Sequence, residues 1–151
     1  MRRKDQEITN RKDIESIIRK SLVCRLAMMD EHEPYIVPLS FGYRDNTLYF
    51  HSAKKGKKLD ILKKNNQVCC EFDIDLKIEK ADKACKWGIE YKSVIGFGKA
   101  SFLKDLESKR KALDIIMKHY SDKSFTYSET DLKKVAIIKV ELQNVTGKQS
   151  I

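Results

Sequence analysis

Residues 47–62 read TLYFHSAKKGKKLDIL, and within this stretch the chain changes from a strand pattern to a helix pattern. The first part is β-branched, aliphatic and aromatic, and it follows the turn-forming pair Asp45-Asn46. From Leu59 onward, leucine and isoleucine recur at helical spacing among lysines and an aspartate. Gly56 and four lysines lie between the two parts, so a glycine-containing loop is expected to join the strand to the helix.

This junction has the features of an anion site. A helix start leaves backbone N–H groups without intrahelical acceptors, and Lys57 and Lys58 place cations beside them. The junction is not a Walker phosphate loop, because the second upstream glycine and the following Ser or Thr are absent. The composition also fits a surface loop of solvated lysines. The residues alone leave both interpretations open.

Upstream of the junction we predict a helix over 10–20 and strands over 22–29, 35–43 and 48–52, the three strands forming an antiparallel meander. Pro38 lies inside the second strand and donates no ladder hydrogen bond. The strand is therefore either interrupted there, which frees backbone groups near Leu39 and Ser40 for a ligand, or it is an edge strand.

Downstream we predict a helix over 57–64, a strand over 67–74, a charged loop over 75–84 and a long strand over 87–102. A helix capped by Asp105 and a strand over 135–142 follow. About six strands and three helices, ordered as meanders and not as βαβ units, favour a mainly β fold, a closed or partly closed antiparallel barrel with peripheral helices.

Length and composition fit one domain over residues 1–151, with 41% hydrophobic and 35% charged residues. No apolar run reaches membrane-spanning length and no signal core follows the N-terminus, so we expect a cytoplasmic protein without a membrane partner. Four cysteines without a CxxC pair fit a reducing compartment, and the three histidines lack ligand-like spacing to them, so no metal site is predicted.

The net charge of +9 is compatible with binding to nucleic acid, but the basic residues are interspersed with 22 acidic ones. A nucleic-acid-binding barrel presents aromatic side chains on an exposed sheet face. Here the aromatic residues alternate irregularly, which is typical of core or interface positions. We therefore expect no nucleic-acid partner.

Several ordered motifs carry a resemblance that spans nearly the whole chain. They are residues 34–43 (PYIVPLSFGY), 48–53 (LYFHSA) with 56–58 (GKK), Cys85 with Trp87, 91–98 (YKSVIGFG), 146–148 (TGK) and the opening MRRKD. Together they resemble the split-barrel flavoproteins related to pyridoxamine 5'-phosphate oxidase, and more narrowly the nitroimidazole-resistance branch. The resemblance implies a homodimer of six-stranded split barrels that binds FMN in clefts between the subunits.

In that setting Lys57 and Lys58, with Ser52, supply cations and donors for the FMN phosphate. Backbone at residues 37–40 forms the rim of the flavin slot, and Ser93 and Tyr91 reach it from the long strand. Trp87 either covers the substrate face or packs in the subunit interface. The candidate cofactor-binding residues are Val37, Pro38, Leu39, Ser40, His51, Ser52, Lys57, Lys58, Tyr91 and Ser93.

His51 is the candidate catalytic residue, because an imidazole titrates near neutral pH and can donate a proton to a reduced intermediate. Two alternatives remain: a histidine hydrogen-bonded in the barrel wall, and an axial ligand of haem. The implied function is an FMN-dependent oxidoreductase that reduces a small, possibly nitroaromatic, acceptor with NADH or NADPH as a transient donor. The alternative is a non-catalytic flavin- or haem-binding protein.

Overall fold

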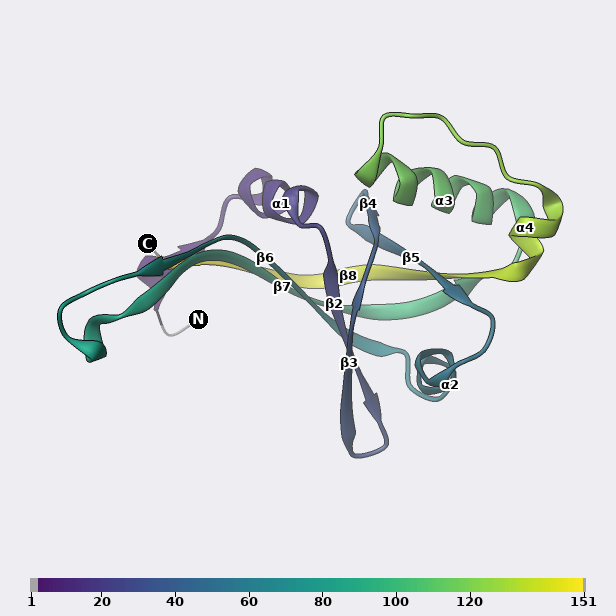
Figure 1. Cartoon of the computed structure of the whole chain (residues 1–151). Helices are drawn as coiled ribbons and strands as arrows, with labels where there is room; N and C mark the ends of the chain where they lie inside the picture. The colour runs from purple at the N-terminus through teal and green to yellow at the C-terminus, as the bar shows by residue number, and fades with distance from the viewer. Residues whose placement is uncertain (1–2, 151) are drawn as a thin grey trace.

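The computed structural model describes residues 3–150, and its frame is one eight-stranded antiparallel sheet. The strands are β1 (Glu7–Ile8), β2 (Cys24–Asp30), β3 (Glu33–Leu39), β4 (Gly42–Arg44), β5 (Thr47–Ala53), β6 (Gln67–Glu79), β7 (Gly88–Leu103) and β8 (Val135–Ser150). They lie in the order β3-β2-β6-β7-β8-β5-β4, and β1 pairs with β8 (Figure 1). The mainly β prediction with peripheral helices is confirmed.

The sheet curls into a barrel that stays open between β3 and β4. These strands are consecutive in the chain yet occupy the two ends of the strand order, and no pairing joins them within residues 3–150. Near this opening, the Tyr120 hydroxyl accepts the Phe41 N–H at 2.9 Å and donates to the Leu22 carbonyl at 2.9 Å. The side chain therefore satisfies backbone groups just before β2 and just after β3, which have no partner in the sheet.

The interior of the barrel follows from period-2 alternation along the strands. In β6 the side chains of Val68, Cys70 and Phe72 are buried, while Cys69 between them is only partly covered, as adjacent residues on a strand require. Phe41 and Phe72 pack with ring centroids 5.1 Å apart. One continuous hydrophobic core results, to which the helix residues Ile17 and Ile18 also belong.

In the described part of the chain, six helices lie around the sheet: η1 (Lys4–Gln6), α1 (Arg11–Lys20), α2 (Lys57–Lys64), η2 (Ala84–Lys86), α3 (Leu106–Tyr120) and α4 (Glu129–Lys134). Asn10 caps α1 by accepting the Lys12 N–H at 2.9 Å, and Asp105 caps α3 by accepting the Ser108 N–H at 2.8 Å. Within residues 3–150 no helix is long and apolar enough to cross a membrane.

Two sequence expectations were wrong in detail, and one open alternative is resolved. β2, β3 and β5 do not form a meander, because β3 pairs only with β2, while β4 and β5 pair with each other at the other end of the strand order. The count of strands is eight because the two-residue β1 is added and the strand expected over 35–43 is divided into β3 and β4. The edge-strand interpretation of Pro38 holds, since β3 runs through it to Leu39 without interruption.

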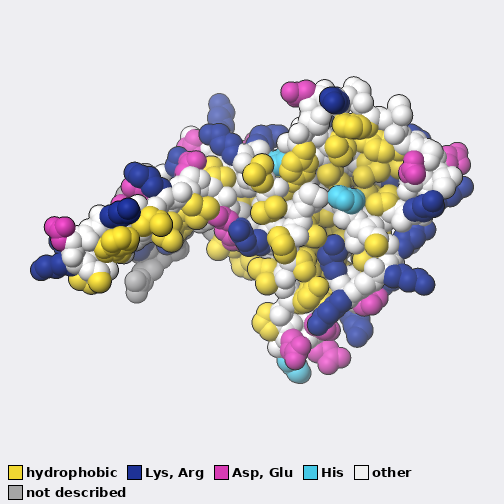
Figure 2. All heavy atoms as spheres, in the orientation of Figure 1, with side chains coloured by type: hydrophobic (Ala, Val, Ile, Leu, Met, Phe, Trp, Pro, Cys, Tyr) yellow, Lys and Arg dark blue, Asp and Glu magenta, His cyan; other side chains and the backbone are white. Residues whose placement is uncertain are grey.

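The predicted charged loop over 75–84 is largely strand. β6 continues to Glu79 and pairs with the start of β7, with a register shift between Ile74 and Lys77. Cross-strand ion pairs support the extension, at 3.4 Å between Lys77 Nζ and Glu90 Oε2. The resulting hairpin projects from the barrel (Figure 1), and hydrophobic side chains line it (Figure 2).

Candidate functional site

The start of α2 presents unpaired backbone donors. Gly56 precedes the helix with φ 139°, and no side chain caps its first turn. The N–H groups of Leu59 and Asp60 bond to the Gly56 carbonyl at 3.0 and 3.2 Å. Those of Lys57 and Lys58 have no acceptor within the described part of the chain. A Cβ at Gly56 would meet nothing within 4 Å, so there is open space beside these donors.

The two lysines of this turn differ in their surroundings. Lys57 Nζ lies 3.5 Å from Asp30 Oδ2 and 5.0 Å from the centroid of the Tyr35 ring, so it points toward the hairpin of β2 and β3. Lys58 is half-buried and takes part in none of the ion pairs among residues 3–150. Burial lowers the pKa of the Lys58 ammonium. An anion at this helix start would offset that cost, so Lys58 could serve as its cation.

His51 and Ser52 lie at the end of β5, directly before this loop. Phe50 is buried in the core and His51 is exposed, so the two side chains point to opposite faces of the strand. Ser52 is half-buried on the same side as Phe50. The His51 ring takes part in no hydrogen bond within the described residues, which does not fit a histidine hydrogen-bonded in the barrel wall.

The segment 37–40 lies at the open edge of the barrel. Val37 and Leu39 are half-buried, whereas Pro38 and Ser40 are exposed. The structure brings this edge close to α2, because Lys57 reaches Tyr35 on β3. The neighbouring Phe41 N–H is taken up by Tyr120 and is not available to a ligand.

Within one chain, Tyr91 and Ser93 lie far from the α2 start. They pair with Ser150 and Lys148 near the end of β8, whereas Ser52 pairs with Ala136 near its beginning. Positions 136 and 148 are separated by about 40 Å along the strand, at about 3.3 Å per residue. Within one chain, Tyr91 and Ser93 therefore do not join the site at α2. Lys148 Nζ donates to the Tyr91 hydroxyl at 2.7 Å, which gives this second group a cation of its own.

The family model described as pyridoxamine 5'-phosphate oxidase matches residues 10–149. The chain belongs to this family. Among solved structures, a candidate 5-nitroimidazole antibiotic resistance protein from Bacteroides thetaiotaomicron is 39% identical, with a TM-score of 0.87 over 95% of this chain and 86% of that one. The resemblance to the nitroimidazole-resistance branch is thereby confirmed. No curated protein matches the chain.

Two more distant structures share the fold alone. The FAD and heme binding protein from Mycobacterium smegmatis is 16% identical, with a TM-score of 0.88 over 96% of this chain and 73% of that one. The flavocytochrome Anf3 from Azotobacter vinelandii is 14% identical, with a TM-score of 0.87 over 100% of this chain and 72% of that one.

The α2 start of this family member fits a phosphate-bearing cofactor. It offers backbone donors without acceptors, a half-buried cation and space beside Gly56. Within residues 3–150 no group of three or more His, Cys, Asp or Glu side chains could hold a metal ion. Sequence reasoning missed Asp30 and Tyr35 as neighbours of Lys57, because only the tertiary fold brings α2 against the β2–β3 hairpin. Sequence reasoning also gave no separate role to Lys148, although this residue lies in the 146–148 motif.

Proposed function

We propose that this protein is a homodimeric FMN-dependent oxidoreductase of the cytoplasm. The observation that carries the proposal is the α2 start, where Lys58 lies half-buried without a carboxylate beside two unpaired backbone N–H groups. An FMN phosphate carries close to two negative charges and matches these donors. Four free cysteines support a reducing compartment.

The second subunit is proposed to dock on the outer face of the sheet. Register places Ile36, Ala27, Cys69 and Phe97 side by side across β3, β2, β6 and β7. Phe97 is 53% and Ile36 59% exposed, which is unusual for large apolar side chains on a sheet face. Beside this row, Arg25 is paired with Glu71 at 3.1 Å and with Asp73, so its charge is already neutralised. An apolar row beside a neutralised ion cluster is suited to a subunit interface.

Dimerisation would also explain why the candidate cofactor-binding residues of one chain lie in two places far apart on the sheet. Tyr91, Ser93 and Lys148 are too far along the sheet to contact a cofactor on their own chain's α2. Their position on β7 and β8 continues the outer face that carries Ile95 and Phe97. In the proposed dimer they complete the cofactor cleft of the partner subunit.

FMN, when bound, supplies the electron-transfer chemistry, with NADH or NADPH as a transient donor and a small acceptor such as a nitroaromatic. The 39% identical Bacteroides protein supports the choice of acceptor. This chain's contribution is to bind and orient the cofactor through the α2 start and the 37–40 edge. His51, whose ring is exposed at the end of β5, is proposed to hold the proton delivered to the reduced acceptor.

The purified protein is expected to show the visible absorption of an oxidised flavin, which bleaches with NADH or NADPH and returns over many turnovers when a nitroimidazole is added. Light scattering of the same sample is expected to give twice the mass of the 17.6 kDa chain. A colourless monomer that does not take up added FMN would overturn the proposal.

A non-catalytic flavin- or haem-binding protein is the second candidate. The exposed His51 ring, which makes no hydrogen bond within the described residues, favours it because such an imidazole is free to ligate haem iron. A haem absorption band that is lost in His51→Ala, or a tightly held flavin that no nicotinamide reduces, would support this candidate over the reductase.

A further inference from the structure

A hollow away from the α2 start lies between the C-terminal turn of α1, β4 and α3. Its volume is about 630 Å³, within the range of small-molecule sites. None of its lining residues belongs to the candidate flavin site. The hollow therefore calls for an explanation separate from the proposed oxidoreductase function.

The walls of this hollow are held in place by direct contacts. A Cβ at Gly42 would lie 2.6 Å from the Ile116 backbone nitrogen, so β4 and α3 approach each other as closely as two backbones can. At the end of α3, His119 Nε2 donates to the Ser21 carbonyl at 2.7 Å, directly after α1. The hollow is thus a fixed feature of the fold rather than a gap between mobile segments.

Cations predominate in the lining. Arg19, Arg44, Lys111 and Lys118 supply four positive charges, against the two carboxylates of Asp45 and Asp114. Of the four, only Lys111 is paired with a carboxylate among residues 3–150, at 3.7 Å from Glu107 Oε1. Like charges gathered without partners are unfavourable, and an anion relieves their repulsion.

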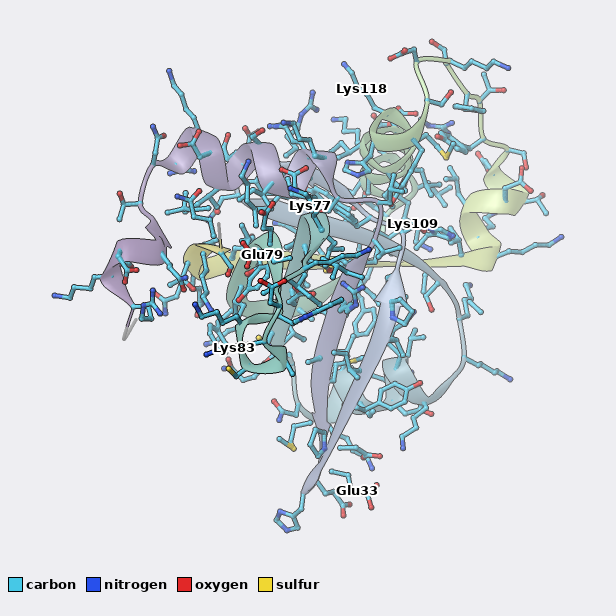
Figure 3. The ribbon with its side chains drawn as sticks, turned by 60° about the vertical axis from the view of Figure 1, so that its left-hand side comes forward. Glu33, Lys77, Glu79, Lys83, Lys109 and Lys118 are labelled. Atoms are coloured by element: carbon cyan, nitrogen blue, oxygen red, sulfur yellow. The ribbon has the colours of Figure 1, made fainter. Side chains whose placement is uncertain are left out.

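One of these cations is held in position before any ligand arrives, and a second lies where the helix end favours it. The Arg19 guanidinium lies 5.3 Å from the centroid of the Tyr43 ring, in a cation–π contact. Lys118 projects from the last turn of α3, where the partial negative charge of the helix end favours a cation (Figure 3). Arginine presents several N–H donors in one plane, which matches the oxygens of a phosphate.

We propose that this hollow binds an organic phosphate of nucleotide size. The phosphate contacts Arg19, Arg44 and Lys118, and hydroxyl or amino groups of the ligand donate to Asp45 and Asp114. The carboxylates distinguish such a ligand from a bare inorganic anion, since they repel an anion but accept hydrogen bonds from a polyol or an amine. The volume of the hollow exceeds what inorganic phosphate alone would fill.

The test is a titration of the ¹⁵N-labelled full chain with ADP, followed residue by residue by NMR. Saturable shifts are expected at Tyr43, Arg44 and the α3 amides, and Arg19→Ala combined with Arg44→Ala is expected to weaken ADP binding at least tenfold. The matched control is Lys12→Ala combined with Lys104→Ala, two exposed lysines outside the hollow, with less than a twofold effect. Lys118→Glu provides a single exposed charge reversal should the double variant not fold.

Inorganic pyrophosphate is the second probe and is expected to bind at the same residues at least fivefold more weakly than ADP. Pyrophosphate binding as tight as ADP would overturn the assignment of an organic ligand. Shifts confined to residues 56–60, equal loss in the control pair, or no saturation at about 1 mM ADP would overturn the site itself. These outcomes do not depend on whether the chain binds FMN.

Discussion

Replacing Lys58 with alanine is expected to weaken FMN binding far more than replacing its neighbour Lys57. Both lysines lie in the first turn of α2 and have the same charge. Lys57 already contacts Asp30 at 3.5 Å and its side chain is 52% exposed, so removing it costs about 0–1 kcal/mol of cofactor binding. Lys58 is half-buried and has no ion-pair partner among residues 3–150, so its contact with phosphate replaces no existing pair.

A hydrogen bond to a charged group contributes about 1.5–3 kcal/mol, so Lys58→Ala is expected to raise the Kd for FMN roughly tenfold to a hundredfold. Lys57→Ala is expected to raise it less than about fivefold. The double variant is expected to lose at least about tenfold. The measurement is a titration of flavin fluorescence, with circular dichroism to show that each variant remains folded.

Lys63→Ala is the matched control, because Lys63 is an exposed lysine on the same helix but in its last turn. It should leave the Kd unchanged. The reasoning is refuted if Lys57→Ala costs as much as Lys58→Ala, or if Lys58→Ala binds FMN as well as the unaltered protein.

Three further predictions concern pH, assembly and packing. Burial lowers the Lys58 pKa below 10.5, so the affinity for FMN should decline as the pH rises through that lowered pKa. This decline should begin at a lower pH than the one at which solvent-exposed lysines lose their protons. A fluorescence titration across pH measures the decline, and Lys58→Met should flatten it. Between the lowered pKa of Lys58 and 10.5, the unfolded chain binds more protons than the folded one. The stability of the flavin-free protein should therefore rise with pH in this range, which thermal melts can check. Phe97→Asp places a charge on the proposed interface and should give monomers by light scattering, whereas the same change at exposed Phe125, away from that face, should leave the dimer intact. Gly42→Ala should destabilise the fold by about 1–3 kcal/mol or more in urea unfolding, because the added Cβ would lie 2.6 Å from the α3 backbone. Gly56→Ala is the comparison: its Cβ meets no atom within 4 Å, so any destabilisation there measures the cost of a positive φ.

The sequence alone determined the features that depend on local chemistry. Asp105 caps a helix where its side chain predicted, and Asn10 caps the helix expected over 10–20, because an N-cap needs only the next few backbone N–H groups. The strand expected over 67–74 is present, and its alternating Val68, Cys70 and Phe72 face the core because neighbouring strand residues must face opposite sides. The short helix α4 was missed, although Ser128 and Asp131 form a capping box that is visible as a local pattern.

The tertiary structure decided what depends on partners distant in the chain. The hairpin of β4 and β5 pairs with β8 and not with β3, and β6 extends to Glu79 because the start of β7 supplies its hydrogen bonds. Lys57 forms an ion pair with Asp30, whereas Lys58 forms none among residues 3–150. The sequence cannot reveal this difference, because the two lysines are adjacent and chemically identical. Likewise, the hollow beside Arg19 exists only because α1, β4 and α3 meet there. Backbone preferences act over a few residues, whereas burial and charge pairing are properties of the folded neighbourhood.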